Sequence, residues 1–314
     1  MKSIATLTMN PTIDVSYDVG KVRHTHKMRT DNEWYAPGGG GINVARVFVR
    51  LGGHARCFYM SGGATGPALD GLIDLHQLVR TRIPINGPTR IASAVLERET
   101  AKEYRFTPSG PTLSRHEWEA CSEALAVDKA PIVVISGSLP PGAPDDYYAM
   151  LGKALRTQGK EVVLDTSGKG LRHALDAGGL MLVKPSQGEL EDYLGHALGD
   201  PQAIAEAARA IVDAGKAQYV AVTMGHRGAI LAHRKGTAIL PGLRIEAASA
   251  VGAGDSFVAA MVFALARGDD VGEAFRLGLA AGSAAVLRAG TGLAHPVDID
   301  RLLKQVAEIS PIAL

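Results

Sequence analysis

A short loop of small residues near the C-terminus carries the pattern in this chain that is most specific for chemistry. It reads Val251-Gly252-Ala253-Gly254-Asp255-Ser256, and an apolar run follows it as far as Ala266. We expect this loop to open directly into a helix, whose first backbone N–H groups and dipole favour a bound anion. Glycines let a phosphate reach those groups, and Asp255 beside it could take a proton from an attacking hydroxyl. The alternative is that Asp255 only caps the helix, because aspartate is a favoured N-cap residue.

A second glycine-rich segment lies near the N-terminus, at Pro37-Gly38-Gly39-Gly40-Gly41-Ile42-Asn43. Val44, Val47, Phe48 and Leu51 follow it at helical spacing. Leading into a helix, the glycines would allow close approach of the backbone to a ligand, with Asn43 free to hydrogen-bond sugar hydroxyls. The alternative is a flexible linker.

Other cofactor motifs are missing from the sequence. No Gly-Lys pair is followed by Ser or Thr, which excludes a P-loop, and no G-x-G-x-x-G follows the first expected strand. The histidines are scattered, and Cys57 and Cys121 both lie in apolar surroundings. We therefore expect neither a zinc site nor a disulfide framework.

Composition and charge narrow the class of protein. The chain has 314 residues, of which 46% are hydrophobic and 5% aromatic, as is typical of an α/β protein. A formal net charge of +1 gives no general attraction to nucleic acid or to an anionic membrane. The start lacks a signal-peptide pattern, and no apolar run approaches the length of a membrane span. We expect a soluble, cytoplasmic protein that holds any anionic ligand with a few local cations.

The candidate functional residues must be positioned by regular secondary structure. Short apolar runs in the sequence indicate buried parallel strands. We expect strands at 4–8, 132–135, 162–164, 181–183 and 220–222, with helices between them. The last four end in polar residues and turns, which begin at Ser136, Asp165, Lys184 and Thr223. Because ligands bind at the carboxyl ends of strands in open α/β sheets, we expect the site there.

Residues 10–37 and 85–108 do not follow this alternating pattern. Within the second stretch, 90–97 and 103–106 read as a β-hairpin. We expect the two stretches to form a small β lid over the strand ends, within one domain that spans residues 1–314.

These motifs together resemble the ribokinase-like (PfkB) carbohydrate kinases. Residues 251–256 resemble the C-terminal signature of that family, and residues 38–43 resemble its N-terminal glycine signature. Residues 8–14 and 136–142 are similar to the phosphosugar branch, and the resemblance extends from about residue 4 to residue 300. It implies an α/β fold with a mainly parallel central sheet and a β lid, which often pairs with the lid of a second subunit. A homodimer is therefore expected, with ATP-dependent phosphorylation of a sugar hydroxyl.

The resemblance also implies roles for individual residues. Asp255 would be the catalytic base, and the backbone N–H groups of Gly252, Ala253 and Gly254 would hold the transferred phosphoryl group. The residues implied to bind sugar hydroxyls are Asp14, Gly39, Gly40 and Asn43. Those implied to surround the phosphate already on the substrate are Lys27, Arg90, Arg105 and Ser138.

The remaining implied residues bind the nucleotide and its ions. For ATP they are Lys184, Ser186, Thr223, Gly225, Gly228 and Ser283. Mg²⁺ is implied as the companion of ATP, with Glu189 reaching it through water. A monovalent cation such as K⁺ would be bound near Ser249, Val251, Ala285, Arg288, Gly290 and Gly292.

Two points concern this chain in particular. Ser186 stands where the family usually has Asn, and its shorter side chain reaches less far toward Mg²⁺-bound water. The four-glycine run favours a 6-phosphofructokinase, since 1-phosphofructokinases commonly place Lys within it. Fructose 1-phosphate and tagatose 6-phosphate remain alternative substrates, and a non-catalytic sugar-phosphate sensor is an alternative of another class.

Overall fold

The computed structural model describes residues 1–288 and 290–313, and its main element is a ten-stranded sheet. In spatial order, the parallel strands of this sheet are β5 (Val79–Ile85), β4 (Ala55–Gly62), β1 (Ile4–Thr8), β8 (Ile132–Ser136), β9 (Glu161–Asp165), β10 (Leu180–Val183) and β11 (Ala217–Thr223). Three antiparallel strands extend it, namely β12 (Gly228–His233), β13 (Gly236–Pro241) and β14 (Ile312–Ala313). The expected mainly parallel α/β fold is therefore confirmed.

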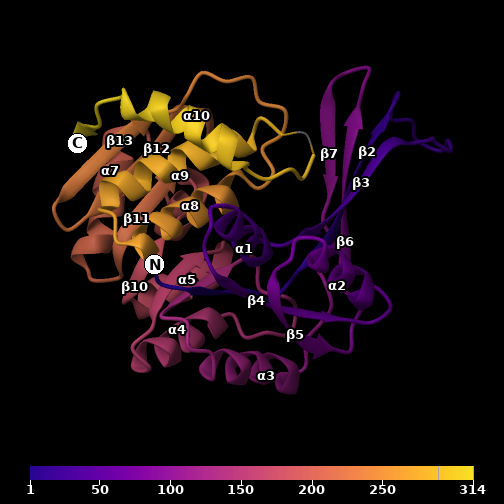
Figure 1. The fold of residues 1–314 in the computed structure, drawn as a ribbon, viewed down its shortest axis with the longest axis horizontal. Coiled ribbons are helices and arrows are strands. Elements are labelled where there is room, and N and C mark those ends of the chain that lie inside the picture. Colours follow the sequence, from indigo (N-terminus) through magenta and orange to yellow (C-terminus); the bar gives the residue numbers. More distant parts are fainter. Residues whose placement is uncertain (289, 314) are drawn as a thin grey trace.

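Helices cover both faces of this sheet, since its central strands are buried and apolar on both sides (Figure 1). One face packs against α1 (Gly40–Arg50), α2 (Gly66–Asp74), α8 (Ala253–Arg267), α9 (Val271–Ala285) and α10 (Pro296–Ala307). The other packs against α3 (Arg115–Ala126), α4 (Tyr147–Thr157), α5 (Gly168–Ala177), α6 (Gln187–Leu194) and α7 (Pro201–Asp213). A 3₁₀ turn, η1 (Gly225–Arg227), joins β11 to β12. Within the described residues, no helix is both long and apolar enough to cross a membrane.

A second, four-stranded sheet projects from the main body (Figure 1). Its order is β3 (Asp31–Gly38), β2 (Thr12–Val19), β6 (Arg90–Glu97) and β7 (Lys102–Phe106). The β6–β7 hairpin is the one that the sequence predicts, and β2 pairs with β6 in parallel. All four strands lie within the two expected stretches, except that β3 continues to Gly38. We call this sheet the lid.

The direction of chain travel across the main sheet reverses at β1. From β1 the chain builds β4 and β5 on one side, and later β8 to β11 on the other. Carboxyl ends of parallel strands on either side of such a switch point splay apart and leave room for a ligand. The lid projects from this part of the molecule, because β2 follows β1 after only three residues.

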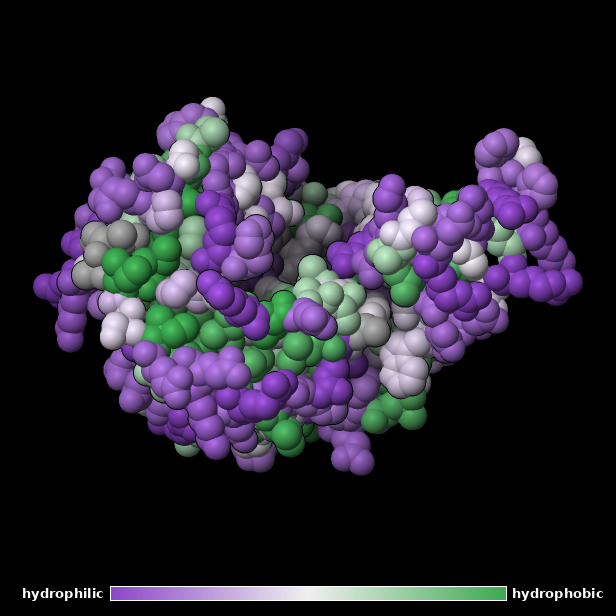
Figure 2. All heavy atoms as spheres, turned by 90° about the horizontal axis from the view of Figure 1, so that it is seen from above, coloured by the Kyte–Doolittle hydropathy of each residue, from purple (hydrophilic) through white to green (hydrophobic). Residues whose placement is uncertain are grey.

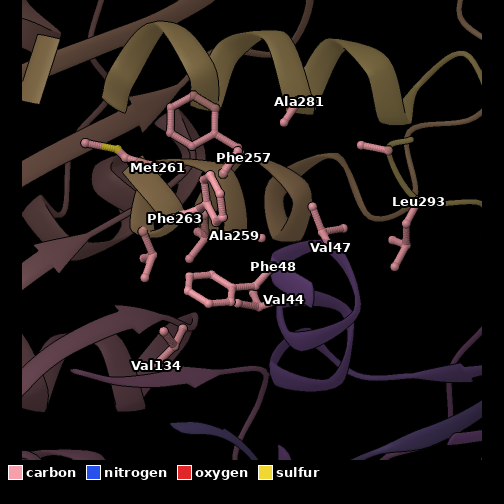
Figure 3. Close-up of a cluster of buried hydrophobic side chains, with 14 of the residues drawn as sticks. Val44, Val47, Phe48, Val134, Phe257, Ala259, Met261, Phe263, Ala281 and Leu293 are labelled. Carbon is pink, nitrogen blue, oxygen red and sulfur yellow. The ribbon is translucent and has the colours of Figure 1, made fainter. Parts of the chain in front are cut away.

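Helix α8 is the central packing element next to the switch point. Phe257 and Phe263 project from it, and they contact Phe275 on α9 and Phe48 on α1 with ring centroids 6.1 Å and 5.6 Å apart. Figure 3 shows Phe48, Phe257 and Phe263 among the buried side chains between these helices and the sheet. Helix α8 is therefore held by apolar contacts with two neighbouring helices.

Truncation at Phe257 tests this packing. Because its ring is buried between α8 and α9, we expect Phe257→Ala to lower the free energy of unfolding by about 3–5 kcal/mol. Val127→Ala, at a position 80% exposed, should change it by less than about 0.5 kcal/mol. Urea unfolding followed by circular dichroism measures both, and equal losses would contradict the central role of α8.

Candidate active site

The N-terminal glycine segment lies directly on the carboxyl ends of β1 and β8. A Cβ atom on Gly40 would be 2.0 Å from the hydroxyl oxygen of Ser136, and one on Gly41 would be 2.4 Å from the carbonyl oxygen of Leu7. Gly39 adopts a φ of +112°, which favours glycine. The segment is packed rather than free, so the linker alternative is wrong. It brings the start of α1 to the switch point.

Asp255 lies in the first turn of α8, but it does not cap the helix. The N-cap is Gly252, with a left-handed φ of 71°, and no side chain caps this end. The carboxylate of Asp255 instead accepts a hydrogen bond of 2.9 Å from the side-chain amide of Asn43. The alternative of a simple capping role is therefore wrong, and the first turns of α1 and α8 meet at this bond.

Both ends of the Asn43 side chain have protein partners, which leaves one of its two N–H donors for the expected contact with a sugar hydroxyl. Its side-chain oxygen accepts a hydrogen bond of 3.1 Å from Arg46, while its NH₂ group donates to Asp255. Sequence analysis did not identify Arg46, which is buried in α1. The available signal was an arginine three residues after Asn43, between the apolar residues Val44, Ala45, Val47 and Phe48.

Asp14 faces Asp255 from the lid. Burial, followed by the negative charge of Asp255, raises the pKa of Asp14 to about 6, although Arg90 and Arg46 oppose this shift. Burial also raises the pKa of Asp255, with the Asn43 hydrogen bond and the charge of Lys184 acting against it. The two carboxylates therefore share one desolvated region.

A small cavity of about 140 Å³ opens beside Asp14, between the lid and the C-terminal glycine loop. Its lining includes Arg105 from the lid, Val251 from the loop and Thr291, whose buried hydroxyl has no partner within the described residues. Figure 2 shows the surface hollowed between the main body and the projecting lid. The cavity therefore has a carboxylate, a guanidinium and a free hydroxyl around it.

The other cations expected around a substrate phosphate differ in their positions. Arg90 is half-buried, and it donates to the main-chain carbonyls of Asn10, Pro11 and Pro108 at 2.7, 3.4 and 2.9 Å. Arg105 is exposed and pairs with Glu103 at 2.5 Å.

Ser138 lies on the main body near Asn10, just before the lid begins, whereas Lys27 lies at the far end of β2. Ser138 is exposed just after β8, 3.4 Å from the side-chain amide of Asn10. Lys27 lies in the exposed loop between β2 and β3, and β2 runs about 16 Å from Asp14 to Val19 before that loop begins. The fold thus gathers Asp14, Arg90, Arg105 and Ser138, but does not bring Lys27 to them within one chain.

A buried ion pair lies next to the start of α8. Lys184, after β10, pairs at 3.0 Å with Asp165 at the end of β9, with side-chain exposures of 6% and 13%. Burial opposes the charge of Lys184, but Asp165, Glu189 and Asp255 together raise its pKa. A Cβ on Gly254 would lie 3.3 Å from the Lys184 ammonium nitrogen. Sequence analysis named Asp165 only as a strand end, yet it orients the cation that faces the glycine loop.

Ser186 acts as a helix cap. Its hydroxyl accepts a hydrogen bond from the Glu189 N–H at 3.3 Å, and Glu189 accepts one from the Ser186 N–H at 2.7 Å. This capping box begins α6 and occupies one oxygen of the Glu189 carboxylate. Both residues, which are expected to reach toward a metal, therefore also have a structural role as the cap of α6.

The other residues expected near a nucleotide lie along the neighbouring strand ends. Thr223 forms a β-bridge with Ser186, and Gly225 begins the η1 turn. Gly228 has a φ of +100°, and a Cβ there would be 2.1 Å from the Leu240 carbonyl oxygen, so only glycine fits. Ser283 lies half-buried on α9, and no hydrogen bond is found between it and this group within the described residues.

Two loops carry the residues expected to bind a monovalent cation. The N–H groups of Ala248 and Ser249 donate to the carbonyl of Val286, so the two loops lie side by side. The Ala285 carbonyl already accepts the Arg288 N–H at 3.0 Å, and Gly290 approaches Ser16 of the lid. The remaining expected positions are Val251, in the first loop, and Gly292, in the second. The two loops that carry the expected cation ligands therefore lie in contact with each other.

Comparisons with known proteins agree with this geometry. The model of the family described as pfkB family carbohydrate kinase matches residues 6–298. The ATP-dependent 6-phosphofructokinase isozyme 2 of Mycobacterium tuberculosis is 42% identical over 308 residues, which cover 97% of this chain and 90% of that protein. Crystal structures of Escherichia coli phosphofructokinase-2 with potassium and with fructose-6-phosphate are both 35% identical, with TM-scores of 0.94 and 0.92. Each covers 98% of this chain and 100% of its own.

The raised pKa of Asp14 predicts a pH-dependent cost to stability. Between the unfolded value of 3.8 and the folded value of about 6, the folded protein binds more protons than the unfolded chain, so stability falls as the pH rises through this window. Two pKa units correspond to about 3 kcal/mol. We therefore expect Asp14→Asn to be more stable than the original protein by up to about 3 kcal/mol at pH 7.5, and by much less at pH 4.

Urea unfolding at the two pH values measures this difference. Ser16→Ala, a neutral change two residues along β2, controls for packing of the lid. A gap between Asp14→Asn and the original protein that is the same at both pH values would contradict the buried-charge interpretation.

Proposed function

We propose that this chain, which belongs to the pfkB family of carbohydrate kinases, transfers the terminal phosphoryl group of ATP to fructose 6-phosphate and forms fructose 1,6-bisphosphate. The observation that carries the proposal is the position of Asp255. It is a desolvated carboxylate in the first turn of a helix, held by Asn43 and close enough to the buried carboxylate of Asp14 to raise the pKa of that group. The printed names of the Mycobacterium tuberculosis and Escherichia coli relatives support this choice of substrate.

The chemistry follows from the first turn of α8. Asp255 takes the proton of the sugar hydroxyl, whose oxygen forms a bond to the terminal phosphorus while the bond to the ADP oxygen breaks. Its raised pKa makes Asp255 a better proton acceptor than an exposed aspartate, provided that it is ionised at working pH. The backbone N–H groups of Gly252, Ala253 and Gly254 and the ammonium of Lys184 stabilise the charge on the transferred group.

The lid and the N-terminal glycine segment hold the acceptor. Asp14, Gly39 and Gly40 bind sugar hydroxyls. Arg90, Arg105 and Ser138 receive the phosphate of the substrate. The three carbonyl contacts of Arg90 fix its guanidinium in place, and a preorganised cation loses less entropy when it binds an anion.

The nucleotide lies over the neighbouring strand ends, at Lys184, Ser186, Thr223, Gly225, Gly228 and Ser283. Mg²⁺ would supply positive charge to its phosphates. The described residues contain no cluster of three acidic, histidine or cysteine side chains that could hold a metal ion alone. This suits an ion that keeps several waters and is bound mainly by phosphates, with Glu189 reaching it through water. K⁺ is the candidate cation for the two contacting loops that carry Ser249, Val251 and Ala285.

The lid is the proposed surface of a homodimer. Five large hydrophobic side chains on its strands are exposed by 39–63%, and they are Trp34, Tyr35, Ile91, Leu96 and Phe106. Such a concentration on one small sheet is typical of a contact between subunits. Lys27 is remote from the site of its own chain, and in such a homodimer it would act at the site of the second copy instead.

The reaction is tested by measuring ADP release with a panel of phosphosugars. We expect fructose 6-phosphate to give a higher kcat/KM than fructose 1-phosphate or tagatose 6-phosphate. Asp255→Asn should lower kcat about 10²–10⁴-fold while ATP analogue binding, measured by calorimetry, persists. Asp213→Asn, an exposed aspartate on α7, is the control. An Asp255→Asn variant with normal kcat would refute the role of base, and no turnover of any phosphosugar by the original protein would refute the kinase.

The dimer is tested by placing a charge on the lid. Phe106→Glu puts a carboxylate at a position 61% exposed, where a monomer tolerates it and an apolar interface does not. We expect sedimentation velocity to show a dimer for the original protein and a monomer for this variant. Val127→Glu, at the C-terminal end of α3 on the main body and 80% exposed, should leave the dimer intact. A monomeric original protein would contradict the proposal.

A further inference from the structure

Arg46 is a charged residue in the middle of a buried helix face. It is only 6% exposed, and its neighbours Val44, Ala45, Val47 and Phe48 on α1 are fully buried. A buried arginine is costly unless charges and hydrogen bonds compensate for the lost hydration. Its surroundings should therefore explain why the chain places a cation here.

One nitrogen of Arg46 connects two parts of the site. Nη1 donates to the carbonyl of Pro37 at 3.0 Å, just before the glycine segment, and to the side-chain oxygen of Asn43 at 3.1 Å. Arginine has donors only, so the atom of Asn43 that it contacts must be the oxygen. The NH₂ group of Asn43 must then point to Asp255, whose carboxylate has only acceptor atoms when it is ionised. Arg46 thus determines which way the Asn43 amide faces.

The charge of Arg46 also faces both carboxylates of the site. Its positive charge acts on Asp14 from β2 and on Asp255 from α8, and it lowers the pKa of each against the effect of burial. The other charges around these groups are Arg90 beside Asp14, Lys184 and Asp165 beside Asp255, and Arg50 and His76 beside Arg46. Burial and Arg50 lower the pKa of Arg46 to about 10, so it remains a cation at neutral pH.

We propose that Arg46 is a positioning residue for phosphoryl transfer, which orients the Asn43 amide toward Asp255 and supplies the buried positive charge shared by Asp14 and Asp255. The inference rests on the proposed kinase activity. Arg46 touches neither substrate nor nucleotide in this role. It acts on the base through Asn43 and through its charge, and these two contributions are separable by substitution.

Two substitutions separate them. Arg46→Met removes both the charge and the donors, and we expect kcat to fall about 10²-fold, as displacement of a catalytic group typically costs. The acid limb of the pH profile of kcat/KM should move to higher pH, because both carboxylates then ionise less readily. Arg46→Lys keeps the charge but loses the guanidinium that spans Pro37 and Asn43. It should lower kcat about tenfold and leave the acid limb in place, with the KM for ATP nearly unchanged in both variants.

Arg276 provides a matched control. Its Nη1 also donates to two oxygens, the carbonyls of Val306 and Ile309, at 2.6 and 2.9 Å, but on α9 and away from both carboxylates. Arg276→Met should lower stability without moving the acid limb or lowering kcat tenfold. A folded Arg46→Met with the kcat and acid limb of Arg276→Met would overturn the proposal. If Arg46→Met does not fold, a normal kcat in Arg46→Lys overturns it.

A readout without turnover keeps this test independent of the proposed reaction. The ¹³C carboxyl signal of Asp14, assigned with Asp14→Asn, can be titrated by NMR in the absence of any substrate. We expect its midpoint to be higher in Arg46→Met than in the original protein, and unchanged in Arg276→Met. An unchanged midpoint in Arg46→Met refutes the charge role of Arg46. Failure of the original protein to phosphorylate a sugar refutes the proposed function instead.

Discussion

The hydrogen bond from Asn43 to Asp255 is the contact on which the arrangement of the site depends, because it joins residues 212 positions apart. It requires the first turns of α1 and α8 to meet over one edge of the sheet. Two helix N-termini repel each other through their dipoles, and the carboxylate between them offsets this repulsion. The close approach further requires glycine at 40 and 41, where a side chain would overlap β8 and β1. The apolar packing of Phe257 and Phe263 then fixes the position of α8 relative to α9 and α1.

Most of the framework could be predicted from the sequence, because buried parallel strands appear as short apolar runs with polar ends. The run at 4–8 matches β1 residue for residue, and the runs at 132–135 and 220–222 lie within β8 and β11. The strands β4 and β5 were missed. In β5, Arg80 and Arg82 break the apolar run, and their charges are compensated by Asp74 and Asp70 on α2. In β4, Arg56 near the start of the strand pairs with Asp128, which is far away in the sequence. Those ion pairs are tertiary contacts, which the local pattern does not contain.

The residues of the site likewise fall into those that local motifs reveal and those that only tertiary contacts reveal. Asp255 and the two glycine segments are local motifs, so their chemistry could be inferred before the fold was known. The roles of Asn43, Arg46 and Asp165 depend on which hydrogen bonds are already made in the folded chain. Both ends of the Asn43 amide have protein partners in the folded chain, which its place in the sequence does not reveal. Ser186 departs from the family pattern, yet its hydroxyl performs the capping function that Asn also performs well.

Two of the connections between the lid and the main body are very short. Only Met9, Asn10 and Pro11 separate β1 from β2, and only Gly39 separates β3 from α1. A rigid-body tilt of the lid therefore changes the torsion angles at Gly39 and pulls directly on the first turn of α1. That turn holds Asn43, and through it Asp255 on the other side of the site. The lid and the Asp255 carboxylate are accordingly mechanically coupled through Gly39 and Asn43, so a tilt of the lid shifts the hydrogen-bond partner of that carboxylate.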